Sequence, residues 1–445
     1  MNIKSGLCIM LKIIFLVMLC ISIYINNNIL LILTIIFQCL SFIVFGWSIS
    51  ISILGSLKKY SKQEEILKKN FKFNIVICAH NEEKVIHGIL NSIEMQRYPS
   101  EYWKVYLIAD NCTDNTVKIA SEYDFINIYE HKTKGAKRKG IALKWGISKI
   151  LEDSPNFGDA FIVFDADNQI IPDFLEIFNK KFQKGCKIVA GNRIAINPYD
   201  SIIASWYAIY WGIIMNLFCK PHNNLGLSAT LSGTGLGFRK ELVEKDGFNT
   251  KTMTEDIEFA TQQSIKGIKI DYAENAIYYD EQPTTIKPMF HQLSRWATGG
   301  NETIKYYIKD MMREFFKNPS IRRFDTLCST FSGNSMAFSV LTGIMLTIMA
   351  FKHGGSWNQY AFFTGIILNI VTYLIAIFSV EKSNLKIRKL LVPILLYPLF
   401  ICIFGLISLC TVFFPQKIWH KIEHYGKYLN MRGAKKIWVM TVIMF

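Results

Sequence analysis

The feature that most constrains the fold is an apolar stretch, residues 13–57, that contains no charged residue. A helix needs about 20 apolar residues to cross the core of a bilayer. The stretch is therefore long enough for two crossings, with the three asparagines at 26–28 as the natural turn between them. A cleavable signal peptide fits less well, because the run is too long and a second one follows immediately. We predict two transmembrane helices within residues 1–57.

The charges that follow this stretch predict its orientation. Residues 58–69 read KKYSKQEEILKK, and a basic flank of this kind marks the cytoplasmic side of a membrane. We expect a protein of the plasma membrane whose residues from 58 onward lie in the cytoplasm. The net charge of +15 favours anionic lipid or a phosphate-bearing substrate as a partner. Nucleic acid is disfavoured, because 51% of the chain is hydrophobic.

Between residues 70 and 280 the pattern changes to short β-branched runs that alternate with helical segments. This alternation predicts an α/β fold, a mostly parallel sheet with helices on both faces. Three of the runs end in polar residues, at 80–82, 110–111 and 165–167. Ligands bind at the carboxyl ends of strands in open α/β sheets, so we expect these polar ends to meet in one crevice.

Three further apolar runs follow, at about 326–351, 355–380 and 391–416. Three crossings would place the basic tail outside the cell, whereas its charge favours the cytoplasm. One run is therefore expected to be interfacial or re-entrant. The last run could bend at Pro393 or Pro398. We expect, however, that the run that does not cross the membrane is the one that contains the polar sequence SGNS, at residues 332–335.

These patterns predict five parts of the chain. They are two transmembrane helices (1–57), a cytoplasmic α/β domain (58–283), a segment of interfacial helices (284–325), a transmembrane region of two or three spans (326–416) and a basic tail (417–445).

Two carboxylates, Asp165 and Asp167, end the apolar run FIVFDADN. Carboxylates at positions i and i+2 past a strand can share Mg²⁺ or Mn²⁺, with substrate phosphates and water completing the coordination shell. A solvated loop or a helix cap before Pro172 is the alternative, and for the pair taken alone it is favoured.

Three more motifs each allow a functional and a purely structural explanation. Asp110, at the end of KVYLIAD, could accept hydrogen bonds from a base or ribose, whereas the nearby Asp114 is explained as a helix cap. Lys139 in KGAKRKGIAL suits a pyrophosphate, although a basic surface loop explains it as well. The glycines of LSGTGLGF (231–238) permit close approach of a ligand to the backbone, but a tight turn needs them too.

The segments TEDIEF (254–259) and QLSRW (292–296) complete the set. Thr254 as an N-cap followed by acidic residues is a complete structural explanation of the first. The functional alternative makes Asp256 a general base. Arg295 can fork onto phosphate oxygens and Trp296 can stack on a sugar ring. For this motif taken alone, an arginine–tryptophan pair at the lipid headgroups is the favoured explanation.

Taken in order, these motifs resemble the membrane-embedded family 2 glycosyltransferases, which include cellulose, hyaluronan, chitin-oligomer and poly-N-acetylglucosamine synthases. The resemblance covers about residues 70–300 and the membrane layout, and it rests on the strings CAHNEE, ADNCTDNT, FDADN, SGTGLGF, TEDIEF and QLSRW. It implies a Rossmann-like GT-A domain flanked by transmembrane helices. Two positions depart from the common pattern: Arg138 replaces a glycine before Lys139, and His80 replaces a tyrosine.

The resemblance implies a role for each matching residue. The nucleotide sugar would be bound by Asn81, Glu82, Asp110, Lys139, Asp165, Gln292 and Arg295, the Mg²⁺ or Mn²⁺ ion by Asp167 and Asp165, and the acceptor by Gly233, Thr234, Gly235, Glu255 and Trp296, with Asp256 as the general base.

The implied activity is a processive, inverting polymerisation of UDP-glucose or UDP-N-acetylglucosamine into a β-linked polysaccharide that is exported through the membrane. About five spans are few for an export path, so a homo-oligomer would help to form one. The alternative is the addition of one sugar to a membrane lipid, since ceramide glucosyltransferases carry a similar QxxRW motif. A scaffold with an inactive domain would lack the carboxylates, and a transporter would place charges inside the apolar runs.

Overall fold

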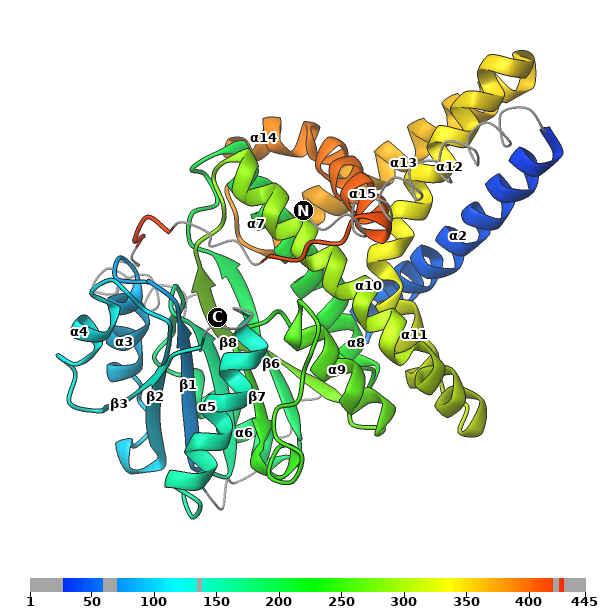
Figure 1. Ribbon diagram of the computed structural model, residues 1–445. Helices are drawn as coiled ribbons and strands as arrows, with labels where there is room; N and C mark the ends of the chain where they lie inside the picture. Colours follow the sequence, from blue (N-terminus) through cyan, green and yellow to red (C-terminus); the bar gives the residue numbers. More distant parts are fainter. Residues whose placement is uncertain (1–26, 59–69, 134–137, 419–423, 428–445) are drawn as a thin grey trace, which may run out of the picture.

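The computed structural model describes residues 27–58, 70–133, 138–418 and 424–427. An α/β domain lies beside a group of long helices (Figure 1). Of the two helices predicted at the N-terminus, the first falls in residues 1–26 and lies outside the described residues. The second is α2 (Asn27–Leu57), and most of its apolar surface is exposed.

The domain is built on an 8-stranded sheet in the order β3-β2-β1-β4-β7-β6-β8-β5. The strands β1 to β4 pair in parallel, and β6 pairs in parallel with β8. Two strands run against their neighbours: β7, between β4 and β6, and the short β5. The mostly parallel α/β sheet expected from the sequence is confirmed. The strands are β1 (Phe73–Ala79), β2 (Trp103–Asp110), β3 (Ile126–His131), β4 (Ala160–Asp165), β5 (Gln169–Ile170), β6 (Ile188–Ala195), β7 (Leu236–Arg239) and β8 (Ile270–Asp280).

Helices cover both faces of the sheet because its central strands are apolar on both sides. In β1, Ile75 and Ile77 face the cluster that contains α3 and α6, and Val76 faces the cluster that contains α5, as the two-residue period of a strand requires. The helices of the domain are α3 (Ile86–Glu94), α4 (Thr116–Ala120), α5 (Lys139–Asp153), α6 (Phe174–Gln183), α7 (Ile202–Ile213), α8 (Lys220–Asn224) and α9 (Glu255–Ile265), with a π-helix, Ile214–Cys219, between α7 and α8.

The polar ends of β1, β2 and β4 meet at one edge of the sheet. Ala79 pairs with Ala109, and Cys78 pairs with Asp165, so the three strands end side by side. The residues that follow β1 and β2 turn sharply: Asn81 has a φ of 60° and Asn111 a φ of 49°. Asparagine tolerates this left-handed conformation better than most residues. The sheet therefore gathers the polar motifs as the sequence predicted.

An apolar helical segment inside the domain was not anticipated from the sequence. Residues 202–224 are long and apolar enough to cross a membrane, yet 61% of their most apolar window is buried. The segment leaves from β6 and leads back to β7, which are paired neighbours in the sheet. It joins the domain to the C-terminal helices: Trp206 Nε1 donates to the carbonyl oxygen of Pro393 at 3.0 Å, and Ser379 Oγ to that of Ile209 at 3.0 Å.

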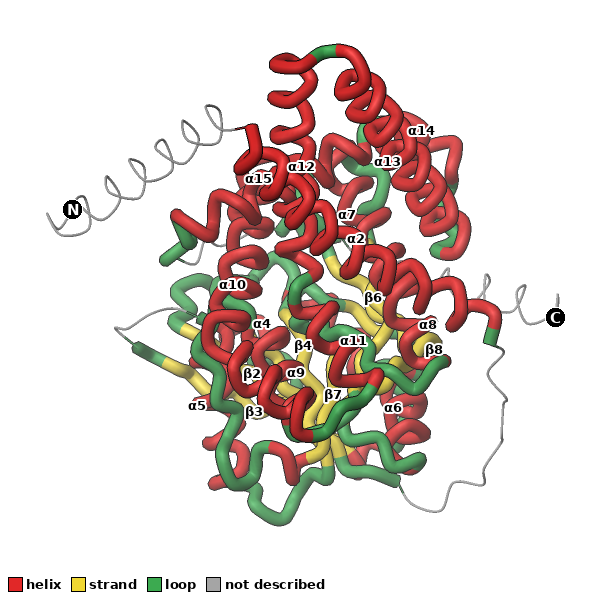
Figure 2. The backbone as a smooth tube through the Cα atoms, turned by 90° about the vertical axis from the view of Figure 1, so that its right-hand side faces the viewer, coloured by secondary structure: helices red, strands yellow, loops and turns green. Residues whose placement is uncertain are grey.

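The remaining helices pack together, most of them above the sheet (Figure 2). In the described residues, four helices could cross a membrane by length and composition, or up to five if α14 and α15 form one span. That pair is bent by 49° at a break between Pro393 and Pro398, whereas the SGNS run forms the unbroken first turn of α12. The helices are α10 (Ile286–Lys317), α11 (Ile321–Thr330), α12 (Ser332–His353), α13 (Gly355–Lys382), α14 (Ile387–Leu395) and α15 (Tyr397–Phe413).

The turn before β7 provides a test of how closely the backbone packs against β8. Gly235 has a φ of 61°, and a Cβ there would overlap the ring of Tyr278. Gly267 has a φ of 78°, but among the described atoms nothing lies within 4 Å of its Cβ position. We expect Gly267→Ala to lower the free energy of unfolding by about 1 kcal/mol through backbone strain, and Gly235→Ala by about 3 kcal/mol or more. Thermal unfolding in detergent measures both, and equal losses would contradict the packing described.

Candidate active site

A cavity of about 420 Å³ opens at the carboxyl ends of β1, β2 and β4 and extends among the helices. Most of the residues singled out from the sequence line it: Glu82, Asp110, Lys139, Asp165, Asp167, Gly233, Glu255, Asp256, Gln292, Arg295 and Trp296. Among the described residues, Asn81, Thr234 and Gly235 do not belong to the lining. The structure thus gathers the distant motifs around one cavity.

At the end of β2, Asp110 is buried and held by its neighbours. Its Oδ1 accepts a hydrogen bond from Asn111 Nδ2 at 2.8 Å and lies 2.9 Å from His131 Nδ1. The side chain of Asn81 is turned toward a neighbouring loop, where its Oδ1 accepts from the backbone amide of Thr113 at 2.7 Å. Asp110 therefore presents a fixed carboxylate to the cavity, while Asn81 shapes the turn next to it.

Asp165 and Asp167 lie in different environments. The backbone amide of Asp165 donates to Thr234 Oγ1 at 2.9 Å and to Asn168 Oδ1 at 3.1 Å, so Thr234 fixes the end of β4 from behind the cavity wall. Asp167 is more deeply buried than Asp165, and this burial, followed by the charges of Asp280 and Asp165, raises the pKa of Asp167 well above its ordinary value. Such an accumulation of carboxylates favours a bound cation.

Lys139, the first residue of α5, forms an ion pair with Asp165. Its Nζ also donates to the carbonyl oxygen of Gly233 at 2.6 Å and lies 3.7 Å from Glu255 Oε1. Burial acts against the charged form, but the carboxylates of Asp165 and Glu255 outweigh it and raise the pKa of Lys139. One buried ammonium group therefore connects three of the sequence motifs.

Asp256 lies in the first turn of α9 and faces residues 232–235, the turn before β7, which we call the glycine loop. Burial, with a smaller contribution from the charge of Glu255, raises the pKa of Asp256 to about 7. A Cβ at Gly233 would lie 3.7 Å from Asp256 Oδ2, and Gly233 has a φ of 81°, so this loop leaves space above the carboxylate. Thr254 makes no capping hydrogen bond through its side chain to the described residues, so capping does not account for the motif. A carboxyl group with a pKa near 7 suits a general base.

The QLSRW segment lies in the first part of α10 and places its tryptophan in an aromatic cluster. The ring of Trp296 stacks on Tyr210 with centroids 5.9 Å apart, and it meets the edge of Trp211 at 5.5 Å. The charge of Arg295 acts on Asp256 and lowers its pKa slightly. Trp296 thus lines the cavity from a position that α7 fixes.

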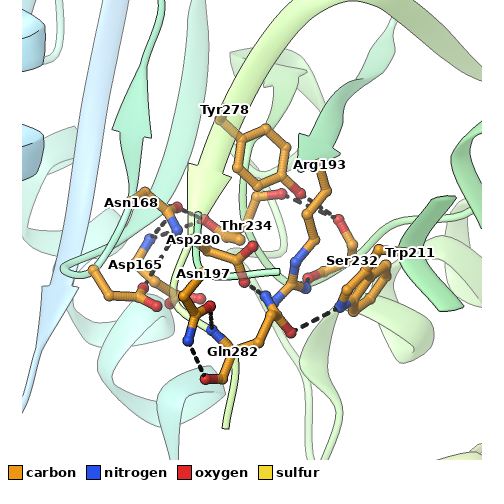
Figure 3. Close-up of polar contacts among 12 residues, drawn as sticks. Asp165, Asn168, Arg193, Asn197, Trp211, Ser232, Thr234, Tyr278, Asp280 and Gln282 are labelled. Atoms are coloured by element: carbon orange, nitrogen blue, oxygen red, sulfur yellow. Dashed lines mark hydrogen bonds and ion pairs between the residues drawn. The ribbon is translucent and has the colours of Figure 1, made fainter. Parts of the chain in front are cut away.

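Three functional candidates were not found by sequence reasoning. Arg193 on β6 and Asp280 at the end of β8 form a buried ion pair beside Asp165 (Figure 3). The third is Glu281, the next residue along the chain. In the string YYDEQ, as in FDADN, an apolar strand ends in carboxylates. This pattern could have identified Asp280 and Glu281 as candidates from the sequence.

Part of the predicted basic tail returns to this site. The carboxylate of Glu281 accepts hydrogen bonds from the backbone amides of Tyr425 at 2.9 Å and Gly426 at 3.2 Å. His424 lines the cavity, and its Nδ1 lies 3.7 Å from Asp167 Oδ2. Backbone amides recognise a carboxylate whatever their side chains, so the tail sequence carries no clear signal for this contact.

The donor set at β4 fits a hard cation that brings other ligands with it. In the described part of the chain, no group of three or more His, Cys, Asp or Glu residues is arranged to hold a metal ion. Asp165 and Asp167 supply carboxylate oxygens, which Mg²⁺ and Mn²⁺ prefer, and the phosphates of a substrate commonly complete such a shell. The residues present therefore fit a metal that arrives with a diphosphate.

The fold and this carboxylate-lined cavity define a glycosyltransferase of the GT-A type. Residues 74–247 match the model of Glycosyl transferase family 2, so the chain carries a family 2 glycosyltransferase domain. The family recognised from the motifs is thereby confirmed.

Relatives extend the similarity beyond the catalytic domain. The chain is 24% identical to the probable glycosyltransferase YdaM of Bacillus subtilis over 392 residues, which cover 82% of this chain and 90% of that protein. It is 24% identical to a poly-beta-1,6-N-acetyl-D-glucosamine synthase of Staphylococcus epidermidis over 330 residues, 70% of this chain and 76% of the synthase. The fold is similar to that of the mannosyltransferase PcManGT from Pyrobaculum calidifontis, solved with GDP-Man and Mn²⁺: the TM-score is 0.58 at 14% identity, covering 85% and 98% of the two chains.

The raised pKa of Asp256 predicts how stability depends on pH. In the unfolded chain this carboxyl group has the ordinary pKa of 3.8, whereas in the folded protein its pKa is about 7. Its ionisation therefore costs the folded state stability as the pH rises through this window. We expect Asp256→Asn to raise the melting temperature relative to the unaltered protein more at pH 8 than at pH 5. The same difference at both pH values would contradict the buried environment of Asp256.

Proposed function

We propose that the protein is an inverting hexosyltransferase that polymerises a UDP-sugar, UDP-N-acetylglucosamine or UDP-glucose, into a β-linked polysaccharide at the membrane, coupled to its export. The similarity to a poly-beta-1,6-N-acetyl-D-glucosamine synthase supports UDP-N-acetylglucosamine as the first donor to test. The cavity supports an extended acceptor, because it does not end at the carboxylates.

The observation that carries the proposal is the continuation of the cavity among the apolar helices. Where the cavity extends among the helices, its lining includes small polar side chains from α2, α10, α12 and α15, namely Ser48, Asn301, Ser332, Asn334 and Ser408. Asn334 Nδ2 donates to Asn301 Oδ1 at 2.8 Å, and Asn301 Nδ2 to Thr411 Oγ1 at 3.2 Å. Polar side chains in an apolar bundle mark a path for a polar substrate, and a glycan is such a substrate.

The chemistry requires a base and a stabilised leaving group. An acceptor hydroxyl attacks the anomeric carbon of the donor, Asp256 takes its proton, and the bond from that carbon to the diphosphate breaks. A single displacement inverts the anomeric configuration, so an α-linked donor yields a β-linked product. Asp256, with its pKa near 7, is ionised in a large fraction of molecules at neutral pH and remains basic enough to accept the proton.

The leaving diphosphate would be held by cationic and polar side chains on two sides. Arg295 and Gln292 approach from α10, and Lys139 from α5. Asp167, with Asp165, would hold Mg²⁺ or Mn²⁺, which neutralises the charge that develops on the diphosphate. Asp167 is the better placed of the two, because Asp165 is already paired with Lys139.

The contacts of the tail support the proposed membrane topology. Residues 424–427 bind the catalytic domain through Glu281, and this contact supports a tail on the same side of the membrane as the domain. In this topology α12 and α13 cross outward and back, and the bent pair α14–α15 begins and ends on the cytoplasmic side. The pair α14–α15, bent by 49°, then enters the membrane and returns to the same side. Only two of the three C-terminal apolar runs cross the membrane, so the basic tail lies in the cytoplasm as its charge predicts.

Release of UDP tests the activity and the base together. Purified protein in detergent with Mn²⁺ or Mg²⁺ should release UDP from UDP-N-acetylglucosamine or UDP-glucose. Asp256→Asn should lower turnover by about 10³-fold or more, because a general base is lost from the transition state, while the Kd for UDP stays within about twofold. Asp173→Asn, which alters a surface carboxylate paired with Arg97, is the matched control. Normal turnover by Asp256→Asn would exclude Asp256 as the base.

Product length separates a polymerase from the alternative, a transferase that adds one sugar to a membrane lipid. Products made in vesicles of defined lipid composition should extend over many sugar units when they are separated by mass spectrometry. A glycolipid that carries a single sugar, with no longer species at any reaction time, would contradict polymerisation and establish the alternative.

A further inference from the structure

One buried guanidinium group joins three parts of the cavity wall (Figure 3). Arg193 lies on β6, and its side chain is 9% exposed. Its NH1 donates to the carbonyl oxygen of Ser232 at 3.0 Å, and its NH2 pairs with Asp280. The guanidinium also lies over the ring of Trp211, 3.8 Å from the centroid. Arg193 therefore connects the glycine loop, the end of β8 and the apolar helix α7.

Two of these three partners lead to the acceptor side of the site, and the third leads to the contact that holds the tail. Ser232 directly precedes Gly233, which leaves the space above Asp256. Trp211 contacts the edge of Trp296, with ring centroids 5.5 Å apart. Asp280 directly precedes Glu281, on which the tail is held. The position of the Arg193 side chain thus influences the glycine loop, Trp296 and the contact between Glu281 and the tail at the same time.

Only arginine can make this combination of contacts. Its planar group donates in two directions at once and also stacks on an aromatic face, whereas a lysine ammonium is a single strongly hydrated point charge. The ion pair is not arranged for stability alone. Among the described residues, Arg193 Nε and Asp280 Oδ1 are buried without a hydrogen-bond partner, and a buried pair left partly unsatisfied contributes little net stability.

We propose that Arg193 is a positioning residue for the acceptor: it fixes the glycine loop relative to Trp296, so that the acceptor hydroxyl reaches Asp256. This inference rests on the proposed function, in which the acceptor lies between Gly233 and Trp296. The donor is expected to be affected much less, because in the described structure the Arg193 guanidinium makes no hydrogen bond or ion pair with the proposed donor ligands Asp110, Lys139 and Arg295. Of the proposed metal ligands, Asp167 is reached by the positive charge of Arg193, and a lysine at this position keeps that charge.

The test separates two reactions of the same protein preparation. Transfer of UDP-N-acetylglucosamine to water gives UDP without any sugar acceptor, and transfer to a β-1,6-linked N-acetylglucosamine oligosaccharide requires the acceptor site. We expect Arg193→Lys to raise the KM for the oligosaccharide about tenfold or more, since misplacing a reacting group by a fraction of an ångström is costly. Hydrolysis of the donor should stay within about threefold of the unaltered protein.

Arg239→Lys is the matched control. Arg239 lies on β7 in the same sheet, donates to the carbonyl oxygens of Cys186 and Phe182, and covers the ring of Phe71, away from the cavity. It should leave the KM for the oligosaccharide unchanged. If Arg193→Lys does not fold, Asp280→Asn removes the charge of the partner with little change of shape and should raise the same KM in the same direction.

Two results would overturn the inference while leaving the proposed function intact. One is an unchanged KM for the oligosaccharide in Arg193→Lys and Asp280→Asn. The other is an equal loss of hydrolysis and transfer in both variants, which would show a merely structural role. If the unaltered protein releases no UDP from either UDP-sugar, the proposed function itself fails, and the inference fails with it.

Discussion

The arrangement of the site depends on the buried ammonium group of Lys139. Three motifs that lie far apart in the chain, FDADN, SGTG and TED, each place an oxygen atom near its Nζ: the carboxylates of Asp165 and Glu255 and the carbonyl of Gly233. Without a cation these carboxylates would repel one another in a poorly hydrated cavity. Lys139 allows them to come together. Asp167 and Asp256, which form no ion pair with Lys139 in the described structure, are the carboxylates that the proposed function assigns to the metal and to the acceptor.

Much of this could be predicted, because the relevant signals are local. Strand patterns that end in Asp110 and Asp165 fix both the fold and the edge at which the cavity forms, since parallel strands end together. Long uncharged stretches predict membrane helices from composition alone. The order of the motifs supplied the family, which matches residues 74–247.

The rest depends on contacts that no local pattern encodes. Arg193 is a charge within an apolar strand, and only its three-dimensional partners show why it is there. The apolar segment at 202–224 is buried against the C-terminal helices, so its composition alone cannot separate a membrane helix from a core helix. The tail is held by hydrogen bonds from its backbone amides to Glu281. Thr234 does not line the cavity and acts indirectly, by accepting a hydrogen bond from the backbone amide of Asp165.

The central claim is a single displacement in which Asp256 activates the acceptor and no enzyme nucleophile takes part. The anomeric configuration of the first bond formed tests this claim most directly. When an α-linked UDP-sugar is the donor, nuclear magnetic resonance of the isolated product should show the large anomeric coupling of a β linkage. An α linkage would require retention of configuration, which a single displacement cannot give, and would contradict this account of the site.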